Sequence, residues 1–313
     1  MTDKKLISIV TPFFNEGEVV AAFYDSVTRV TNTIPDVEFE FICVNDGSQD
    51  DTLEKLAQLV ADDARVRVID LSRNFGKEAA LTAGLDESRG DAVIPMDADL
   101  QDPPELIAVL ISHWKQGYEV VLAKRSNRQS DSYLKRKTAE FFYRLHNRIS
   151  DTPLPEDVGD FRLIDRAVVT ALQALPERRR FMKGLFAWVG FKTTTVEYVR
   201  TARVAGKTKF SGWKLWNFAL EGITSFSTMP LRVWTYIGTS FAVIGFLYAL
   251  FIILRVITLG IDVPGYASLL TVVLVLGGIQ FIGIGVIGEY IGRIYIESKQ
   301  RPIYIVRNRL QRK

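Results

Sequence analysis

The chain has 313 residues, enough for one large domain or two ordinary ones, and it carries 39 Lys and Arg against 36 Asp and Glu. This near balance of charge gives no sign of a nucleic-acid partner. A single cysteine, Cys43, excludes an intrachain disulfide, and its apolar setting in "FEFICV" indicates a buried thiol. The apolar run near the N-terminus is interrupted by Pro12 and Asn15 and is too short for a signal peptide. We therefore expect the polar part of the chain to stay in the cytoplasm.

Short apolar runs alternate with longer amphipathic stretches from the N-terminus to about residue 165. We predict strands at 6–13, 38–46, 66–72, 91–97 and 118–125, with helices at 18–33, 51–63, 77–88 and 104–117. This order is typical of an α/β domain with a mainly parallel sheet covered on both faces, and we assign it residues 1–210. In such sheets ligands bind beyond the carboxyl ends of the strands, where "PFFNE", "NDGSQDD", "SRNFGKE" and "DADLQDPP" collect polar side chains.

The C-terminal part of the sequence turns apolar. Residues 233–257 carry one charge and residues 267–288 carry none. Each stretch is long enough to cross a hydrocarbon core of about 30 Å at about 1.5 Å per residue. We therefore predict two transmembrane helices, at about 233–257 and 267–290, with a pair of buried core helices as the alternative. The loop between them lacks Lys and Arg, so the positive-inside rule places both termini in the cytoplasm.

The segments on either side of the two spans also suit a membrane surface. Residues 211–232 mix tryptophans and other apolar residues with few charges, which predicts an interfacial amphipathic helix; a helix packed on the domain is the alternative. Residues 293–313 form a basic tail that suits an anionic membrane face. Small residues on the second span allow close contact between protomers and favour a homo-oligomer. They are Gly277, Gly278, Gly283, Gly285 and Gly288.

Asp97 and Asp99 follow one predicted strand in "DAVIPMDADLQDPP". In a strand, residues i and i+2 point to the same face, so the two carboxylates would converge and would need a cation between them. Carboxylate oxygens suit Mg²⁺ or Mn²⁺, whose other positions are taken by water and substrate phosphates. The pattern predicts a metal site that stabilises a leaving diphosphate; an exposed Asp-x-Asp pair in a turn is the alternative.

Two further polar stretches, "TPFFNE" and "VNDGSQDDT", lie where a predicted strand ends and a helix begins. Their Asn and Asp side chains are placed to hydrogen-bond a base or a ribose. Ordinary turn and helix-cap chemistry is the alternative.

Eight motifs together resemble one enzyme family. "IVTPFFNEGEVV", "ICVNDGSQDDT", "LSRNFGKEAALTAGL" and "AVIPMDADLQDPPE" are similar to the consecutive signatures of the inverting family-2 glycosyltransferases, whose nucleotide-diphosphosugar-binding domain has the GT-A fold. "VGDFRLIDR", "RVAGKTKFSGWKLW", "ALEGITSFSTMPLR" and "GVIGEYIGRIYIESKQRP" narrow the resemblance to the bactoprenol glucosyltransferases. These are relatives of dolichyl-phosphate mannose synthase and of polyprenyl-phosphate aminoarabinose transferases. The resemblance runs from about Leu6 to Pro302.

The resemblance implies a UDP-sugar donor, a divalent metal, and a polyprenyl phosphate acceptor at the lipid bilayer. Donor binding would fall to Pro12, Asn15, Glu16, Asn45, Asp46, Asp97, Ala98 and Gln101. Asp97 and Asp99 would hold Mg²⁺ or Mn²⁺ on the diphosphate, so Asp99 also belongs to the catalytic set.

The same resemblance implies residues for the acceptor and for catalysis. Arg125 and Arg136 would bind the acceptor phosphate, although the basic stretch around Arg136 also reads as a solvated helix face. Asp160 in "VGDFR" would act as a base or position the acceptor, with a structural hydrogen bond to Arg162 as the alternative. The basic loop "ARVAGKTKF" would fold over the donor diphosphate. Its cations are Arg203, Lys207 and Lys209.

The implied reaction moves glucose from UDP-glucose to undecaprenyl phosphate with inversion, at the bacterial inner membrane. The β-linked lipid phosphosugar would serve O-antigen, lipopolysaccharide or other envelope glycosylation, with a flippase and a second glycosyltransferase acting after it. A different donor carrying mannose, GlcNAc or aminoarabinose is one alternative, and a membrane-tethered sugar-nucleotide-binding subunit is another. The sequence has no Gln-x-x-Arg-Trp motif of a processive synthase and no P-loop, so it excludes both of those classes.

Overall fold

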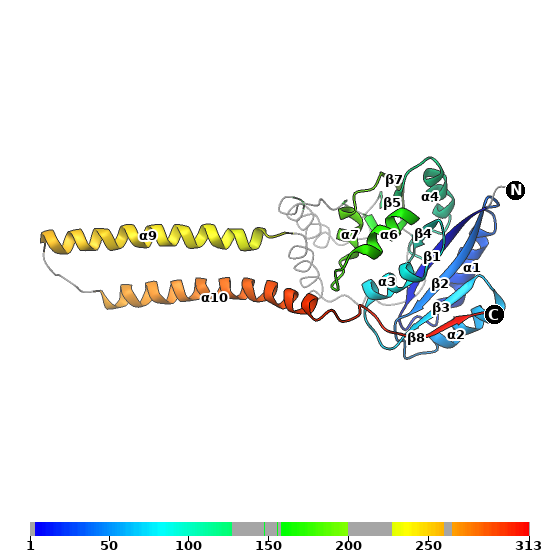
Figure 1. Ribbon diagram of the computed structural model, residues 1–313, viewed down its shortest axis with the longest axis horizontal. Coiled ribbons are helices and arrows are strands. Elements are labelled where there is room, and N and C mark those ends of the chain that lie inside the picture. The colour runs from blue at the N-terminus through cyan, green and yellow to red at the C-terminus, as the bar shows by residue number, and fades with distance from the viewer. Residues whose placement is uncertain are drawn as a thin grey trace.

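A computed structural model describes residues 4–126, 147, 155, 158–199, 227–259 and 265–312. Residues 211–226 of the predicted interfacial segment at 211–232 lie outside these described residues, as do Arg136, Arg203, Lys207 and Lys209. A sheet domain and a long helical hairpin make up the described chain (Figure 1).

An eight-stranded sheet forms the centre of the domain. Across the sheet the strands are β7 (Thr193–Tyr198), β5 (Val120–Arg125), β6 (Val158–Asp165), β4 (Ala92–Pro95), β1 (Lys5–Phe13), β2 (Val37–Asn45), β3 (Val66–Leu71) and β8 (Val306–Gln311). β6 runs antiparallel to β4 and β5, and β8 runs antiparallel to β3, whereas the other neighbours are parallel. The predicted α/β class with a mainly parallel sheet is confirmed.

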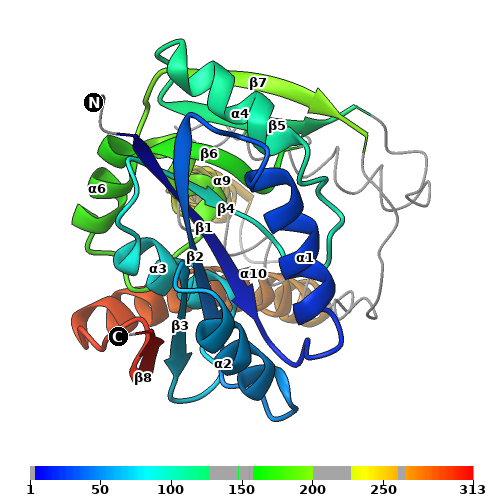
Figure 2. The same cartoon turned by 90° about the vertical axis from the view of Figure 1, so that its right-hand side faces the viewer.

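Helices cover both faces of the sheet (Figure 2). α1 (Val20–Thr31), α2 (Thr52–Asp62) and α4 (Leu106–Lys115) share one apolar core with the sheet, and α3 (Lys77–Glu87), α6 (Arg166–Ala174) and α7 (Met182–Trp188) share the other. α1 buries Val20, Phe23 and Val27 at helical spacing. α3 lies close against the sheet, because a Cβ added at Gly84 would be 2.2 Å from Val10 Cγ1.

The strand directions bring the polar loops to one edge of the sheet. β1, β2, β3 and β4 are parallel to one another. β5 runs in the same direction, because β4 and β5 are both antiparallel to β6. The segments that follow these five strands therefore meet at one edge, where β6 begins. This edge is the one that the sequence predicts for ligand binding.

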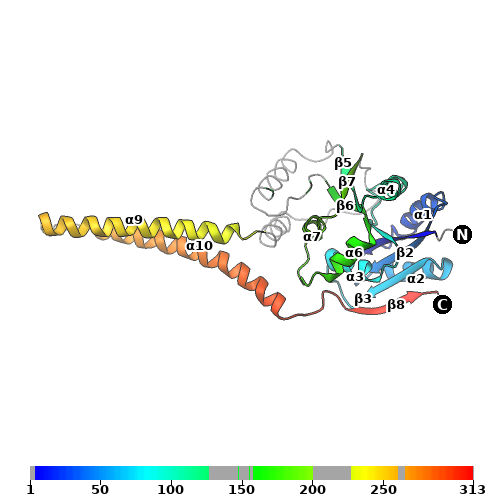
Figure 3. The ribbon, with the colours of Figure 1, turned by 45° about the horizontal axis from the view of Figure 1, so that its top comes forward.

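α9 (Met229–Leu259) and α10 (Tyr266–Ser298) form a hairpin that projects away from the sheet domain (Figures 1 and 3). Each contains a stretch long and apolar enough to cross a membrane, Val233–Ile252 and Val275–Ser298, with little of it buried in the protein. α9 begins at Met229 rather than 233, and α10 continues to Ser298 rather than 290. The helices meet where a Cβ added at Gly283 would lie 3.3 Å from Trp234 Cε3, so this glycine packs within the chain.

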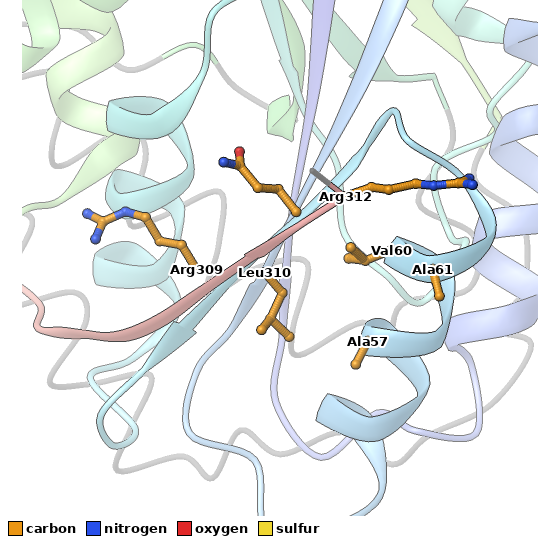
Figure 4. A pocket seen from close by; sticks show the side chains of 7 residues that line it. Ala57, Val60, Ala61, Arg309, Leu310 and Arg312 are labelled. Carbon is orange, nitrogen blue, oxygen red and sulfur yellow. The ribbon is translucent and has the colours of Figure 1, made fainter.

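The end of the predicted basic tail is a strand. β8 pairs with β3, Leu310 packs against one core layer, and Tyr304 and Val306 pack against the other. Arg309 adds an ion pair to Glu87 at 2.8 Å. The apolar residues between the arginines thus find partners in the sheet domain, which local charge does not predict. Leu310 points toward α2 at an open groove of about 500 Å³ between α2 and β8 (Figure 4).

Asp63 holds the turn between α2 and β3. Its carboxylate accepts hydrogen bonds from the Arg65 backbone N–H at 2.8 Å, from Arg65 Nη2 at 2.7 Å and from the Tyr24 hydroxyl. Burial alone would raise the pKa of Asp63, but Arg65 and Tyr24 outweigh it and lower the pKa to about 2.

We expect Asp63→Asn to lower the free energy of unfolding by about 2 kcal/mol at pH 7. A carboxylate with a depressed pKa stabilises the fold above its unfolded pKa, and this contribution is lost as the pH falls toward the folded value of about 2. Denaturant unfolding of wild type and variant should therefore differ at pH 7 and converge toward pH 2. Asp62→Asn is the matched control and should change stability little; an Asp63→Asn gap that persists at low pH contradicts the prediction.

Candidate active site

Loops after β1 and β2 are joined by the side chains of their polar motifs. Asn15 has a left-handed backbone (φ 51°), which Asn tolerates better than most residues. Its Oδ1 accepts a hydrogen bond from the Gln49 N–H at 2.8 Å, and its own N–H donates to Ser48 Oγ at 3.0 Å. The Glu16 N–H donates to Thr52 Oγ1 at 3.0 Å. Asn15 and Glu16 therefore belong to one rigid double loop, which Pro12 in β1 leads into.

Asn45 and Asp46 lie at the centre of this edge and are both buried. Asn45 Nδ2 donates to Asp70 Oδ1 at 2.8 Å. Asp46 accepts hydrogen bonds from the backbone N–H groups of Phe75 and Gly76 at 2.7 and 3.0 Å. Burial raises the pKa of Asp46, and the two backbone hydrogen bonds oppose that rise. Both side chains hold loops in place, and direct contact with a base stays a prediction.

Lys77, the first residue of α3, places its ammonium between two predicted site residues. Its Nζ lies 2.7 Å from Asp97 Oδ1 and 2.6 Å from Asp160 Oδ2. Gly76 precedes it with φ +97°, a conformation that suits glycine and lets the chain turn from β3 into α3. One cation therefore joins the start of α3, the loop after β4 and the start of β6.

The charges at this point alter one another's pKa values. Burial lowers the pKa of the Lys77 ammonium, but Asp160 and Asp97 outweigh that effect and leave the pKa above its ordinary value. Burial raises the pKa of Asp160, but Lys77 and Lys183 outweigh it and hold the pKa well below its usual range. Glu78 differs, because burial and the Asp160 charge raise its pKa to about 7. Asp160 is therefore a carboxylate at neutral pH.

Asp97 and Asp99 lie in a turn, because β4 ends at Pro95. The predicted strand to residue 97 is wrong at this end, and strand alternation is not what places the two acids. Leu100 turns the chain with φ 52°, and Asp99 Oδ1 accepts the Gln101 N–H at 3.2 Å.

The carboxylate of Asp97 is 33% exposed and already attracts one cation, Lys77. Within the described parts of the chain, no three His, Cys, Asp or Glu side chains gather as a metal cage. Mg²⁺ needs no such cage, since one or two carboxylates with water and substrate phosphates suffice. Accessible acidic oxygens in a cation-attracting turn therefore fit a hard divalent ion.

Arg125 ends β5 beside Tyr198, which ends β7. The Tyr198 hydroxyl donates a hydrogen bond to Asp102 and also interacts with the Arg125 guanidinium. Burial and Asp102 raise the pKa of Tyr198 to about 12 against the opposing effect of Arg125. Asp102 is buried in the same turn as Asp99. Tyr198 thus links the predicted acceptor arginine to the predicted metal turn.

The structure brings most of the predicted site residues to one edge of the sheet. They are Pro12, Asn15, Glu16, Asn45, Asp46, Asp97, Ala98, Asp99, Gln101, Arg125 and Asp160. Three residues at this edge were not among the predicted site residues: Lys77, Asp102 and Tyr198. A lysine directly after a glycine, in the segment that joins a strand to the next helix, is a usable signal for Lys77. The contact between Asp102 and Tyr198 joins distant segments and leaves no local signal.

Two protein-family models match this chain, one over the sheet domain and one over the helical hairpin. The model of glycosyl transferase family 2 matches residues 8–172. The chain belongs to this family. A second model, the GtrB C-terminal hairpin, matches residues 229–294 of this glycosyltransferase. This range includes all of α9 and most of α10. The family and the GT-A domain predicted from the motifs are confirmed.

Individual relatives match over nearly the whole chain. A bactoprenol glucosyl transferase of Shigella phage SfV is 57% identical over 306 residues, covering 98% of this chain and 99% of that protein. A prophage bactoprenol glucosyl transferase homolog of Escherichia coli K12 is 56% identical, covering 96% and 98%. A mannosyltransferase from Pyrobaculum calidifontis, solved in complex with GDP-Man and Mn²⁺, is 17% identical with a TM-score of 0.49, covering 70% of this chain and 61% of that chain.

Proposed function

We propose that this glycosyltransferase moves glucose from UDP-glucose to undecaprenyl phosphate. The observation that carries the proposal is the 57% identity, over 98% of this chain, to a bactoprenol glucosyl transferase. The edge described above supports it with anionic, cationic and polar groups suited to a nucleotide diphosphate. Two helices long and apolar enough to cross a membrane would keep the domain beside a lipid acceptor.

The reaction needs little acid-base chemistry. An oxygen of the acceptor phosphate attacks the anomeric carbon, and the bond from that carbon to the donor diphosphate breaks with its electron pair leaving on UDP. In-line attack inverts the configuration, so an α-linked donor gives a β-linked lipid phosphosugar. Positioning and charge neutralisation then supply most of the rate.

The metal proposal rests on Asp97 and Asp99. These acids would hold Mg²⁺ or Mn²⁺, which when bound neutralises the charge that develops on the diphosphate. Lys77, fixed by Asp97 and Asp160, adds a permanent positive charge at the same point. Because the pKa of Asp160 is lowered, its carboxylate is a weak base, and we assign it to positioning rather than proton removal.

The donor and the acceptor would bind to different loops at this edge. Pro12, Asn15, Glu16 and the turn at Asn45 form the wall for the nucleotide. Ala98 and Gln101 lie in the turn that faces the diphosphate. The acceptor phosphate would bind Arg125 together with Arg136, and Arg203, Lys207 and Lys209 would close over the donor; these last four lie outside the described residues.

A transfer assay tests the reaction and the metal together. Full-length protein with undecaprenyl phosphate, UDP-glucose and Mn²⁺ or Mg²⁺ should form lipid phosphate glucose, and EDTA should stop it. Asp97→Asn should lower kcat by about 100-fold or more, because it would weaken binding of the metal that stabilises charge on the leaving oxygen. The matched variant Asp62→Asn should keep full activity.

The outcomes of this assay separate the alternatives. Turnover only with GDP-mannose, UDP-GlcNAc or an aminoarabinose donor would overturn the assignment of glucose. Nucleotide binding without transfer from any donor would favour the binding-subunit alternative. Full activity in EDTA, or in Asp97→Asn, would overturn the metal assignment.

Arg125→Ala should raise the KM for undecaprenyl phosphate by about tenfold or more and change the KM for UDP-glucose little, because a charge-assisted hydrogen bond to phosphate is lost. Steady-state kinetics with each substrate varied in turn measures this split. Lys115→Ala, an exposed cation that pairs with Asp36, is the control. An equal rise in both KM values would place Arg125 outside the acceptor site.

We propose that the protein lies in the bacterial inner membrane with its sheet domain and both termini in the cytoplasm. The domain-side ends of the two helices contact each other, and the end of α10 also contacts the sheet domain. The Tyr290 hydroxyl on α10 donates to the Ser227 carbonyl just before α9, and Glu297 at the end of α10 accepts the Arg178 N–H at 3.0 Å. After α10 the chain returns to the sheet as β8.

A reporter inserted at Asp262, between α9 and α10, should therefore be labelled from outside the cytoplasm only. A reporter at the C-terminus should be labelled from the cytoplasmic side only. Labelling of both positions from the same side would contradict this topology.

A further inference from the structure

Asp70 is a buried carboxylate next to the proposed nucleotide site. It is 1% exposed, near the end of β3, and its register partner on β2 is Asn45. Asn45 Nδ2 donates to Asp70 Oδ1 at 2.8 Å, and Asn45 Oδ1 accepts the Ser48 N–H at 3.2 Å. A carboxylate only accepts hydrogen bonds, so it obliges Asn45 to turn its NH₂ group toward Asp70 and its oxygen toward Ser48.

The orientation of Asn45 also affects the loop after β1, because Ser48 contacts both. Ser48 Oγ accepts the Asn15 N–H at 3.0 Å, and Asn15 Oδ1 accepts the Gln49 N–H at 2.8 Å. The chain of contacts therefore runs from Asp70 through Asn45 and Ser48 to Asn15. These last three residues form or support the wall that we assign to the nucleotide.

The other oxygen of Asp70 faces the C-terminal strand. Among the residues that the structure describes, none gives Asp70 Oδ2 a hydrogen bond. Arg307 Nη1 lies 3.9 Å from it, and Arg307 Nη2 is fixed by donating to the Ser72 carbonyl at 2.6 Å. The backbone also holds this position, because the Ser72 N–H donates to the Ile305 carbonyl at 2.9 Å. A buried carboxylate needs such compensation, since an unpaired charge is costly to bury.

We infer that Asp70 is a positioning residue for the nucleotide-binding turn and that Arg307 makes this turn depend on the seating of β8. Arg307 follows both apolar helices in the chain, so donor binding would be coupled to the attachment of the membrane hairpin. The inference rests on the proposed function, because it takes the turn at Asn45 as the nucleotide site. Neither Asp70 nor Arg307 contacts the donor in this arrangement.

The inference predicts a selective loss of nucleotide affinity. Titration of full-length protein with UDP in the presence of Mn²⁺ should show about fivefold weaker binding for Arg307→Ala, a modest change because the Arg307 side chain is 57% exposed. Arg307→Lys should recover part of the loss. Arg309→Ala is the matched control, since it removes the same side chain from the same strand but its partner is Glu87. It should leave UDP affinity unchanged.

Asp70→Asn tests the orienting role itself. An amide can donate as well as accept, so this variant keeps the shape but no longer obliges Asn45 to adopt one orientation. UDP binding should weaken about tenfold, while the KM for undecaprenyl phosphate stays unchanged. Adding Arg307→Ala to Asp70→Asn should cause little further loss, because the two residues act through one contact.

Unchanged UDP affinity in Arg307→Ala and Asp70→Asn would overturn the inference. Equal weakening in Arg309→Ala would also overturn it, since β8 would then act through general stability, which thermal unfolding of each variant reports separately. Arg307→Ala keeps the test decisive if Asp70→Asn does not fold. If the wild-type protein binds UDP but transfers no sugar, weaker UDP binding in Arg307→Ala and Asp70→Asn would leave this inference standing while the proposed reaction fails.

Discussion

The Lys77 ammonium between Asp97 and Asp160 is the interaction on which the rest of the site depends. It draws together the start of α3, the turn after β4 and the start of β6, and without a cation the two carboxylates would repel each other at short range. The parallel strands and the antiparallel strand β6 bring these segments to one edge, but the strand order does not by itself make the edge electrostatically stable. The proposed divalent ion would meet the same demand for positive charge and would in turn attract a diphosphate.

Much of the fold and part of the site follow from sequence pattern. Alternation of apolar strands and amphipathic helices predicted the sheet and the edge at which Asn15, Asn45 and Asp97 gather. Asp97 and Asp99 do lie at the predicted edge, but the reason given for it was wrong. β4 ends at Pro95, so a turn and not strand alternation places both acids. Strand ends depend on pairing with neighbours, and β4 pairs with β6, a partner distant in sequence.

Apart from Lys77, which follows Gly76 and so leaves a local signal, the features that sequence reasoning missed depend on contacts between distant segments. Tyr198 meets Asp102, and β8 pairs with β3 although the whole hairpin lies between them in the chain. A short stretch such as "IVRNRLQR" reads as a basic tail, because it carries three arginines and no acidic residue. Its role as an edge strand appears only when β3 offers an unpaired edge and two core layers offer sites for Tyr304, Val306 and Leu310.

The pairing of β8 with β3 also constrains the topology that this chain can adopt in a membrane. A chain that leaves the sheet domain at α9 and rejoins its sheet as β8 must cross a membrane an even number of times, whatever the charges of its loops. Two is the smallest even number of spans above zero, and α9 and α10 are each long and apolar enough to provide one of them. Pairing with β3 therefore restricts topology by connectivity, whereas the positive-inside rule restricts it by charge. Because the two arguments are independent, their agreement carries more weight than either one alone.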